Sequence, residues 1–454
     1  MSVFKHVVAV VCLAGLAVSP ALAAAPVEIP FWHSMPGTLG ERLQELADRF
    51  NQSQQAYQVV LVYKGSSASA MKAALDAERS GNPPVIAQVL EAGTENMLGS
   101  VEDSNAKGKK ARKIPTRPLY QVMAEAKQKF DTKALIPAIA GYYEDTKGHL
   151  LSFPFNSVTP VLYYNKDAFR KAGLDPEAPP KFWPAVQAAA QAILDSHATP
   201  CAFTTAWQTW IHVENLHARN NELFASQLNG FGGLKSDLVF NDQLEMRHIA
   251  LLSAWHKGTL FNNYGPADEA EPWFYRGNCA MLTSTSASYP AIKAKAQFEV
   301  GVAELPYYED YHYMGAPQNS IAGGSSLWVM AGKKPAEYKG AAQFIAFLAQ
   351  PAVQAEWHQQ TGYLPVTFAG YELSRKQGYY EKNPGAEVAV LQVSVSKGSP
   401  LARGIRLGNF AQIRGLIDGE LETVWDDKKP TKQALDDAVK DGNELLRDFE
   451  RANK

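Results

Sequence analysis

The sequence has few cysteines, nearly balanced charge and no long hydrophobic run beyond its N-terminal segment. Of its 454 residues, three are cysteines, and 44 basic side chains face 46 acidic ones, for a net charge of −2. This balance provides no general attraction for nucleic acid or for an anionic membrane. We therefore expect no nucleic-acid partner. The length allows two or three domains with sizeable cores.

The N-terminal segment has the pattern of a cleaved secretory signal. Lys5 precedes an apolar run at residues 7–18, and a small-residue site at residues 21–23 follows it. The run is shorter than the ~20 residues that a membrane-spanning helix needs. We predict a signal peptide at residues 1–23 and a soluble, exported mature chain.

Two cysteines, Cys201 and Cys279, lie outside the predicted signal, whereas Cys12 lies inside it. An exported protein matures in an oxidising compartment, where a disulfide between these two residues would persist. The sequence alone does not place their Cα atoms within bridging distance. Whether the two cysteines are joined stays open at this point.

The sequence also lacks the common catalytic motifs. It has no G-x-S-x-G turn, no H-E-x-x-H helix and no G-x-x-x-x-G-K-[ST] loop. His212, Glu214 and His217 resemble a metal cluster, but polar side chains on one amphipathic segment more often face solvent. We expect no catalytic residue, no metal and no cofactor. The hydroxyl-rich stretches at residues 284–288 and 323–326 favour an anion receptor.

Apolar runs alternate with amphipathic segments from residue 27 onward. Strand-like runs lie at residues 27–34, 57–65 and 84–93, and segments with helical spacing lie at 37–50 and 67–81. This order predicts a parallel sheet with helices on its faces. Ligands of such sheets bind at the carboxyl ends of the strands, which here hold Trp32, His33, Ser34, Lys64, Gly65 and Glu91.

Three later segments carry further information on the organisation of the chain. Residues 150–169 read as extended chain with two prolines, which could leave one lobe and enter another, and residues 319–332 form a second extended stretch. Residues 431–449 have the apolar spacing of a surface helix. The polar, basic segment at residues 100–118 indicates a solvated loop rather than a nucleic-acid or heparin site, since it stands alone on a slightly acidic chain.

The segment TAWQTWIHVEN at residues 205–215 sets Trp207 and Trp210 three residues apart. This spacing fits one face of a helical turn. The two indoles could fill a core or face a ligand, and the spacing does not decide between these alternatives.

Several motifs, in register over nearly the whole mature chain, carry a resemblance to a known family. They are IPFWHSM, PFNSVTPVLYYNKDAFRKAGLDPEAPPK, WQTWIHVEN, FYRGNCAM, GGSSLWVM, AEWHQQTGYLPVT, GYYEKNPGA, RLGNFAQIR and ELETVWDDKKPTKQALD. Together they resemble the periplasmic glycerol-3-phosphate-binding proteins of ABC transporters, within the extracellular solute-binding protein family 1. The basic segment at residues 100–118 is longer than this family leads us to expect.

The resemblance implies an α/β, two-lobed periplasmic binding protein fold of the class II type. Each lobe would be a mostly parallel sheet flanked by helices, and three hinge crossings would join the lobes. We expect one lobe to comprise residues 26–157 and 323–369, and the other residues 158–322 and 370–454. A monomer in the periplasm would close on its ligand and deliver it to permease subunits of the inner membrane, which a cytoplasmic ATPase drives.

The family's ligand-binding positions fall on named residues of this sequence. Glu91 would accept hydrogen bonds from glycerol hydroxyls. Gly324 would offer a backbone N–H with no side chain in the way. Tyr363 would donate its hydroxyl proton to a phosphate, and Arg414 would supply a permanent charge and a planar fork of donors. Thr285 replaces a family serine conservatively.

Two positions depart from the family pattern. Ser67 stands where we expect a tyrosine, and Val158 stands where we expect a serine. These changes remove polar contacts, for which neighbouring Ser66, Ser157 or Ser286 could compensate. In the family the tryptophan pair lines the cleft, so the resemblance implies that Trp207 and Trp210 face the ligand.

The implied ligand is glycerol-3-phosphate or a glycerophosphodiester such as glycerophosphocholine. An indole can hold a quaternary ammonium by cation–π attraction, so we expect glycerophosphocholine to bind more tightly than glycerol-3-phosphate. A sugar- or oligosaccharide-binding protein of the same fold is the alternative, although it would not need Arg414. A secreted hydrolase would require a nucleophile or paired acids, which the motifs do not supply.

Overall fold

The computed structural model describes residues 25–102, 112–310, 317–394 and 398–453. The predicted signal peptide and residues 103–111 of the basic segment lie outside these ranges. Two short strands, β4 (Val101–Glu102) and β5 (Arg112–Lys113), pair antiparallel at the base of that segment. In the described ranges, no helix is both long enough and apolar enough to cross a membrane.

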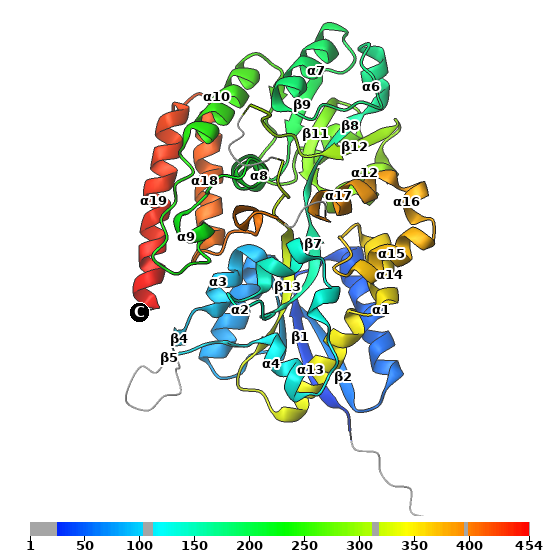
Figure 1. The fold of residues 1–454 in the computed structure, drawn as a ribbon, viewed down its shortest axis with the longest axis vertical. Coiled ribbons are helices and arrows are strands. Elements are labelled where there is room, and N and C mark those ends of the chain that lie inside the picture. The colour runs from blue at the N-terminus through cyan, green and yellow to red at the C-terminus, as the bar shows by residue number, and fades with distance from the viewer. Residues whose placement is uncertain (1–24, 103–111, 311–316, 395–397, 454) are drawn as a thin grey trace, which may run out of the picture.

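Two sheets, each flanked by helices, form two lobes that lie one above the other in Figure 1. The strands of the first sheet, in the order β2-β1-β3-β13-β6 with β7 beside β13, are β1 (Val27–His33), β2 (Tyr57–Tyr63), β3 (Ile86–Leu90), β6 (Thr116–Arg117), β7 (Phe153–Val158) and β13 (Gly323–Met330). The strands of the second sheet, in the order β10-β9-β11-β8-β12, are β8 (Pro160–Asn165), β9 (Cys201–Thr205), β10 (Phe261–Asn262), β11 (Cys279–Thr285) and β12 (Val300–Glu304).

Helices cover both sheets. Around the first sheet lie α1 (Gly37–Ser53), α2 (Ser67–Arg79), α3 (Thr94–Leu98), α4 (Leu119–Glu125), α5 (Pro137–Ala140), α13 (Pro335–Leu348) and α14 (Pro351–Thr361). Around the second lie α6 (Lys166–Lys171), α7 (Trp183–Asp195), α8 (Asn215–Arg219), α9 (Ser226–Asn229), α10 (Gln243–Lys257), α11 (Glu271–Tyr275), α12 (Tyr289–Lys295) and α17 (Pro384–Ser394). The helices α15 (Phe368–Lys376) and α16 (Tyr379–Lys382) lead from α14 to α17.

The predicted elements of the N-terminal half are confirmed. In α1, the apolar residues at helical spacing point into the core, where Leu43, Leu46, Ala47 and Phe50 are buried. In β1, burial alternates along the strand, as expected for one buried face. The parallel pairing of β1 with both β2 and β3 also agrees with the β-α-β order of the sequence.

In each sheet a single strand runs against the others, so the prediction of mostly parallel sheets is confirmed. The strand β13 runs antiparallel to β3, β6 and β7, and β8 runs antiparallel to β11 and β12. The reason is the direction of the crossings between lobes. The strands β1, β3 and β7 end at the interface between the lobes, whereas β13 begins there and runs away from it.

The chain crosses between the sheets at Thr159, which separates β7 from β8. It returns at the start of β13 and crosses a third time between α14 and α17. The hydroxyls of Thr159 and Ser320 form a hydrogen bond, and Gln392 Nε2 donates to both of these oxygens at 2.8 and 3.0 Å. The N–H of Leu364 donates to the Ser157 carbonyl at 2.7 Å. All three crossings are therefore tied together, while the exact lobe boundaries stay a prediction.

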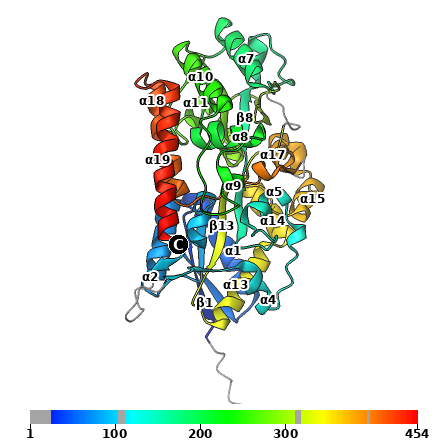
Figure 2. The ribbon, with the colours of Figure 1, turned by 60° about the vertical axis from the view of Figure 1, so that its left-hand side comes forward.

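Two long C-terminal helices, α18 (Phe410–Trp425) and α19 (Thr431–Ala452), pack on each other and on α10. Figures 1 and 2 show α19 running along the side of the second lobe, with its C-terminal end near the first. There the N–H of Ser100 donates to Asn453 Oδ1 at 2.7 Å. At the start of α18, the N–H of Asn409 donates to Asn96 Oδ1 at 3.2 Å. These contacts fix the orientation of α18, which projects side chains between the lobes.

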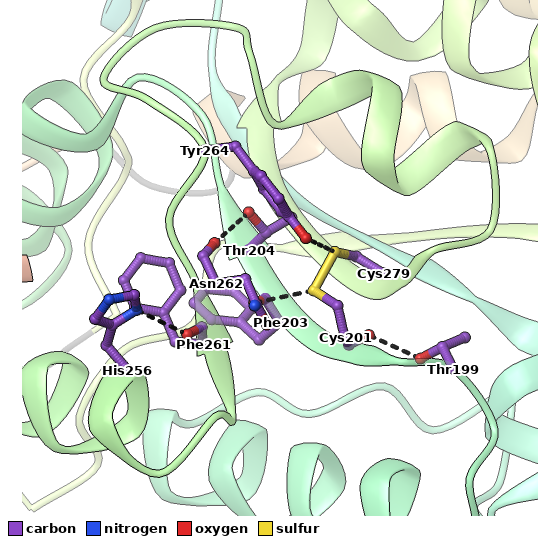
Figure 3. The surroundings of a disulfide bond; sticks show 9 residues. All are labelled: Thr199, Cys201, Phe203, Thr204, His256, Phe261, Asn262, Tyr264 and Cys279. Atoms are coloured by element: carbon purple, nitrogen blue, oxygen red, sulfur yellow. Dashed lines mark hydrogen bonds between the residues drawn. A yellow bond between two sulfur atoms is a disulfide. The ribbon is translucent and has the colours of Figure 1, made fainter.

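The two mature cysteines form a disulfide, which settles the question that the sequence left open. Cys201 and Cys279 stand opposite each other on the paired strands β9 and β11, with their Cα atoms 4.4 Å apart. Figure 3 shows the bond at the beginning of both strands, with Tyr264 beside it; the Tyr264 hydroxyl lies 3.8 Å from Cys279 Sγ. The bond lies at the opposite ends of these strands from the residues that face the first lobe.

Candidate ligand-binding cleft

A cavity of about 400 Å³ lies between the two sheets. The first lobe contributes the carboxyl ends of β1 and β3 and the start of α2, and the second contributes the ends of β9 and β11. Every residue that the family resemblance assigned to ligand binding lies on its wall, namely Ser67, Glu91, Val158, Trp207, Trp210, Thr285, Gly324, Tyr363 and Arg414. Of the residues expected at the carboxyl ends of the strands, Ser34 and Glu91 line the cavity, whereas Trp32, His33, Lys64 and Gly65 do not. The structure thus brings together the set that the resemblance implied, and its contact with a ligand stays a prediction.

Arg414 projects from α18 and pairs with two carboxylates from different segments. Its Nε and Nη2 donate to Glu214 at 2.6 and 2.9 Å, and Nη2 also donates to Glu91 at 2.9 Å. Burial opposes the charge of the guanidinium, but the two carboxylates outweigh this effect and raise the pKa of Arg414. In the part of the chain that the structure describes, Nη1 has no hydrogen-bond acceptor, so its two N–H groups stay available for an anion.

Glu91 links the two lobes. One oxygen of its carboxylate accepts from Arg414, and the other accepts from the N–H of Gly324 at 3.0 Å. The Gly324 amide that we expected to be free for a ligand is therefore already engaged. Each carboxylate oxygen has a second lone pair, so Glu91 can still accept a hydrogen bond from a hydroxyl group.

Gly324 is a position that only glycine can occupy. Its φ is +99°, and an added Cβ would lie 1.7 Å from the Asn156 carbonyl oxygen. This close approach of β13 to β7 leaves no room for a side chain at this point of the cavity wall.

The two tryptophans differ in environment. Trp207 precedes the helical turn with a φ of +52°, and its side chain is 39% exposed. Trp210 begins a π-helical turn (Trp210–Glu214), is 7% exposed and packs against Gly323. The prediction of one helical face was wrong, because the chain turns sharply at Trp207. Both indoles nevertheless line the cavity, and Trp210 also packs in the hydrophobic core.

The remaining predicted residues present few free polar groups. Tyr363 is stacked on Trp357 at 6.1 Å between ring centroids, and burial raises the pKa of its hydroxyl, which a hydrogen bond with Asn156 opposes. Ser67 Oγ lies 3.2 Å from Ser34 Oγ, within hydrogen-bond distance. Val158 supplies only an apolar surface.

The cavity wall also holds four polar residues that the sequence did not point to, Gln88, Asn156, Thr209 and Asp418, beside Ser34 and Ser325, which lie in stretches already noted above. Gln88 Nε2 donates to Asn156 Oδ1 at 2.7 Å, and Gln88 Oε1 accepts from the Ser34 N–H at 2.9 Å. Gln88 interrupts the apolar strand IAQVL, and Asn156 interrupts FPFNSV. A polar residue inside an otherwise buried strand was the signal that could have identified them.

The serines expected to compensate for Ser67 and Val158 do not lie on the cavity wall. Ser66 Oγ caps α2, where it accepts from the N–H of Ser69. Ser286 Oγ accepts from the N–H of Thr159, and Ser157 is a buried residue of β7. Ser34 and Ser325 are the serines that line the cavity beside Ser67.

The cluster of His212, Glu214 and His217 is buried, so the expectation that these side chains face solvent was wrong. Glu214 binds Arg414, whereas His212 contacts His248 and Thr205 at 2.9 Å each. Burial lowers the pKa of His212 to about 3, which keeps the ring neutral. The described residues contain no group of three or more potential ligands arranged to hold a metal ion.

Two lobes of mixed α/β structure, joined by three crossings around an interlobe cavity, define the class of solute-binding proteins that bind a small molecule between their lobes. A family model for bacterial extracellular solute-binding proteins matches residues 45–386. The chain belongs to this family. Such proteins capture a small molecule outside the cytoplasm and act together with the permease of an ABC transporter.

Close relatives cover nearly the full chain. The sn-glycerol-3-phosphate-binding periplasmic protein UgpB of Yersinia pseudotuberculosis is 48% identical over 98% of both chains. The protein of the same name from Salmonella paratyphi A is 50% identical over 97% of this chain and 98% of its own. These relatives are periplasmic, and the chain described here is a periplasmic solute-binding protein.

Solved structures with lower sequence identity share the fold. UgpB from Mycobacterium tuberculosis in complex with glycerophosphocholine has a TM-score of 0.72 at 21% identity, covering 94% of this chain and 99% of its own. The cyclic alpha-maltosyl-1,6-maltose binding protein from Arthrobacter globiformis has a TM-score of 0.70 at 21% identity, covering 93% and 100%. These similarities confirm the predicted two-lobed α/β class.

Proposed function

We propose that this protein captures glycerol phosphate esters, namely glycerol-3-phosphate and glycerophosphodiesters, in the interlobe cavity. The observation that carries the proposal is Arg414, an arginine on the cavity wall with one pair of N–H donors left free. A sugar offers no anion for such a group, whereas a phosphate oxygen does. The names of the relatives at 48 to 50% identity support the same ligand class.

The other wall residues match the parts of such an ester. Glu91 retains lone pairs that can accept from the glycerol hydroxyls. Trp210 has a buried indole N–H with no acceptor among the described residues, so it can donate to an ester oxygen. The exposed face of Trp207 can cover the glycerol carbons or a cationic head group.

The protein would bind the ester without catalysing any reaction on it. Closure of the two lobes would trap the ester. One lobe would comprise residues 26–157 and 323–369, and the other residues 158–322 and 370–454. A closed monomer would then dock on the permease subunits in the inner membrane, and ATP hydrolysis by the cytoplasmic ATPase would drive release. Purified protein should liberate neither phosphate nor choline from any ester.

Isothermal titration calorimetry of the mature protein with glycerol-3-phosphate, glycerophosphocholine and maltose tests the proposal. Arg414→Ala should weaken binding of both phosphate esters by about 2 to 5 kcal/mol, because the anion loses its cation inside the cleft. The exposed Arg375 provides the matched control, and Arg375→Ala should leave affinity unchanged. Tight binding of maltose with no binding of phosphate esters would refute the proposal in favour of a sugar-binding protein.

A further inference from the structure

The charges around the cavity do not suit an isolated dianion. Arg414 is the only cationic side chain on the described wall, and it already pairs with Glu91 and Glu214. A third carboxylate, that of Asp418, also lines the cavity. Three acids therefore surround one guanidinium, and a ligand with two negative charges would meet net repulsion beyond the arginine.

Asp418 lies one helical turn after Arg414 on α18. Its Oδ1 accepts from the Thr209 hydroxyl at 2.6 Å, and its backbone carbonyl accepts from Gln208 Nε2 at 3.3 Å. Both partners directly follow Trp207 in the sequence. Asp418 is thus held by the two residues that follow the exposed indole, and both Asp418 and Trp207 line the cavity.

No Lys, Arg or His of the described ranges forms an ion pair with Asp418 within 4.0 Å. Burial raises the pKa of this carboxyl group, while the Thr209 hydroxyl and the charge of Arg414 oppose the rise. A partly buried carboxylate without a cation partner is costly unless another group neutralises it. A ligand cation placed against Trp207 would be that group.

We infer that Asp418 and Trp207 form a subsite for an ammonium group, so that the cavity selects zwitterionic glycerophosphodiesters over phosphate monoesters. This inference rests on the proposed function. On α18 the cation of Arg414 is followed four residues later, about 6 Å further along the axis, by the anion of Asp418. This order of charges is the reverse of the phosphate and amine in an ethanolamine or choline ester. In these esters two carbons separate the phosphate oxygen from the nitrogen, a length that matches one helical turn.

The apolar residues of the wall fit the same ligand. Met35, Leu39, Leu90 and Pro266 line the cavity together with the indoles. A trimethylammonium group carries its charge behind three methyl groups, which apolar side chains accommodate without unmet hydrogen bonds. Closure of the lobes would bury the trimethylammonium group between Asp418 and the apolar residues of the wall.

The test compares four ligands by calorimetry on the wild-type protein and on Asp418→Asn. The ligands are glycerophosphocholine, glycerophosphoethanolamine, glycerophosphoglycerol and glycerol-3-phosphate. The wild-type protein should bind the two amine esters at least about tenfold more tightly than glycerophosphoglycerol, which has the same phosphodiester with a neutral head.

The substitution Asp418→Asn should remove most of the advantage of the amine esters. Both amine esters should bind roughly tenfold more weakly, whereas glycerol-3-phosphate should bind more tightly, because a negative charge near the phosphate is gone. Thr209→Val, which keeps the carboxylate but removes its hydroxyl donor, should have a smaller effect with the same head-group pattern.

Each outcome separates the inference from the proposed function. Equal losses for all four ligands in Asp418→Asn would show a structural role only and overturn the subsite. Wild-type binding of glycerophosphoglycerol as tight as that of the amine esters would also overturn it, even where Asp418→Asn fails to fold. Both results leave the proposed function intact, whereas wild-type protein that binds none of the four esters would refute the proposed function itself.

Discussion

Arg414 and Glu214 are joined by two parallel hydrogen bonds across the gap between α18 and the π-helical turn. Glu214 is 2% exposed, and both of its carboxylate oxygens are used by this one partner. The pair holds the guanidinium plane in a single orientation and leaves Nη1 free toward a ligand. Glu214 is therefore a positioning residue for Arg414.

Replacing Glu214 with Gln should destabilise the protein. Arg414 would keep Glu91 but lose half of its compensating negative charge inside a buried site, so the free energy of unfolding should fall by about 2 to 3 kcal/mol. Urea denaturation followed by circular dichroism measures this change. Glu372→Gln, which removes an exposed ion pair with Arg375 at 3.8 Å, is the control and should change the free energy by less than about 0.5 kcal/mol. Equal effects of the two substitutions would contradict the buried-pair argument.

The sequence predicted the helices and the parallel strands of the first lobe, but not the direction of β13. Periodicity alone indicated α1, α2 and the strands β1 to β3, because these elements repeat one local unit. The antiparallel strand β13 could not be predicted in this way. Its direction follows from where the chain re-enters the first lobe, which depends on contacts among Thr159, Ser320 and Gln392 that are distant in sequence.

The resemblance to the family identified cavity residues that the local sequence around each residue would not have placed in one site. Glu91 and Arg414 are 323 positions apart, and nothing local to either predicts their ion pair. Conversely, Asp418 was missed although it lies one turn from Arg414. An acidic residue on an amphipathic helix usually faces solvent, and only the hydrogen bond from Thr209 turns it toward the cavity.

The two tryptophans should respond differently to truncation. Trp210 is largely buried, so Trp210→Ala should lower the free energy of unfolding by about 3 to 5 kcal/mol. Trp207 is 39% exposed, so Trp207→Ala should cost about 1 kcal/mol of stability while it weakens glycerophosphocholine binding by roughly tenfold. Glycerol-3-phosphate, which has no cation, should lose less.

Urea titrations and calorimetry on the same two variants make this comparison. The exposed Trp273, at 40%, lies outside the cavity wall and provides the control, since Trp273→Ala should leave both affinities unchanged. Equal losses of affinity for the two esters in Trp207→Ala would mean that this indole acts only as an apolar wall.

The disulfide should contribute to stability without affecting the ligand. It closes a separation of 78 residues between neighbouring strands, so Cys201→Ser with Cys279→Ser should lower the free energy of unfolding by about 2 to 4 kcal/mol. Thr285, on the cavity wall, lies six residues along β11 from Cys279, or roughly 20 Å at 3.3 Å per residue. Ester affinities measured by calorimetry at 25 °C should therefore match those of the wild-type protein, and a tenfold loss would contradict this separation of roles.

Acid should destabilise the protein partly through His358. Its Nδ1 donates to the Tyr363 carbonyl at 2.6 Å, its Nε2 accepts from the Tyr380 hydroxyl at 2.9 Å, and burial lowers the pKa of the ring to about 4. The unfolded chain binds a proton at this position below about pH 6.5, whereas the folded protein does not. The stabilisation from the neutral ring is thus complete above pH 6.5 and is lost as the pH falls toward 4.

His358→Gln isolates this contribution, since a glutamine amide can donate to Tyr363 and accept from Tyr380 without titrating. Wild-type protein should lose about 2 kcal/mol more unfolding free energy than His358→Gln between pH 7.5 and pH 5, from 1.4 kcal/mol for each of about 1.5 pH units. The buried rings of His212 and His248 are present in both proteins, so their titration cancels in the comparison. Urea denaturation at the two pH values measures the difference, and identical losses in the two proteins would show that His358 is not the group responsible.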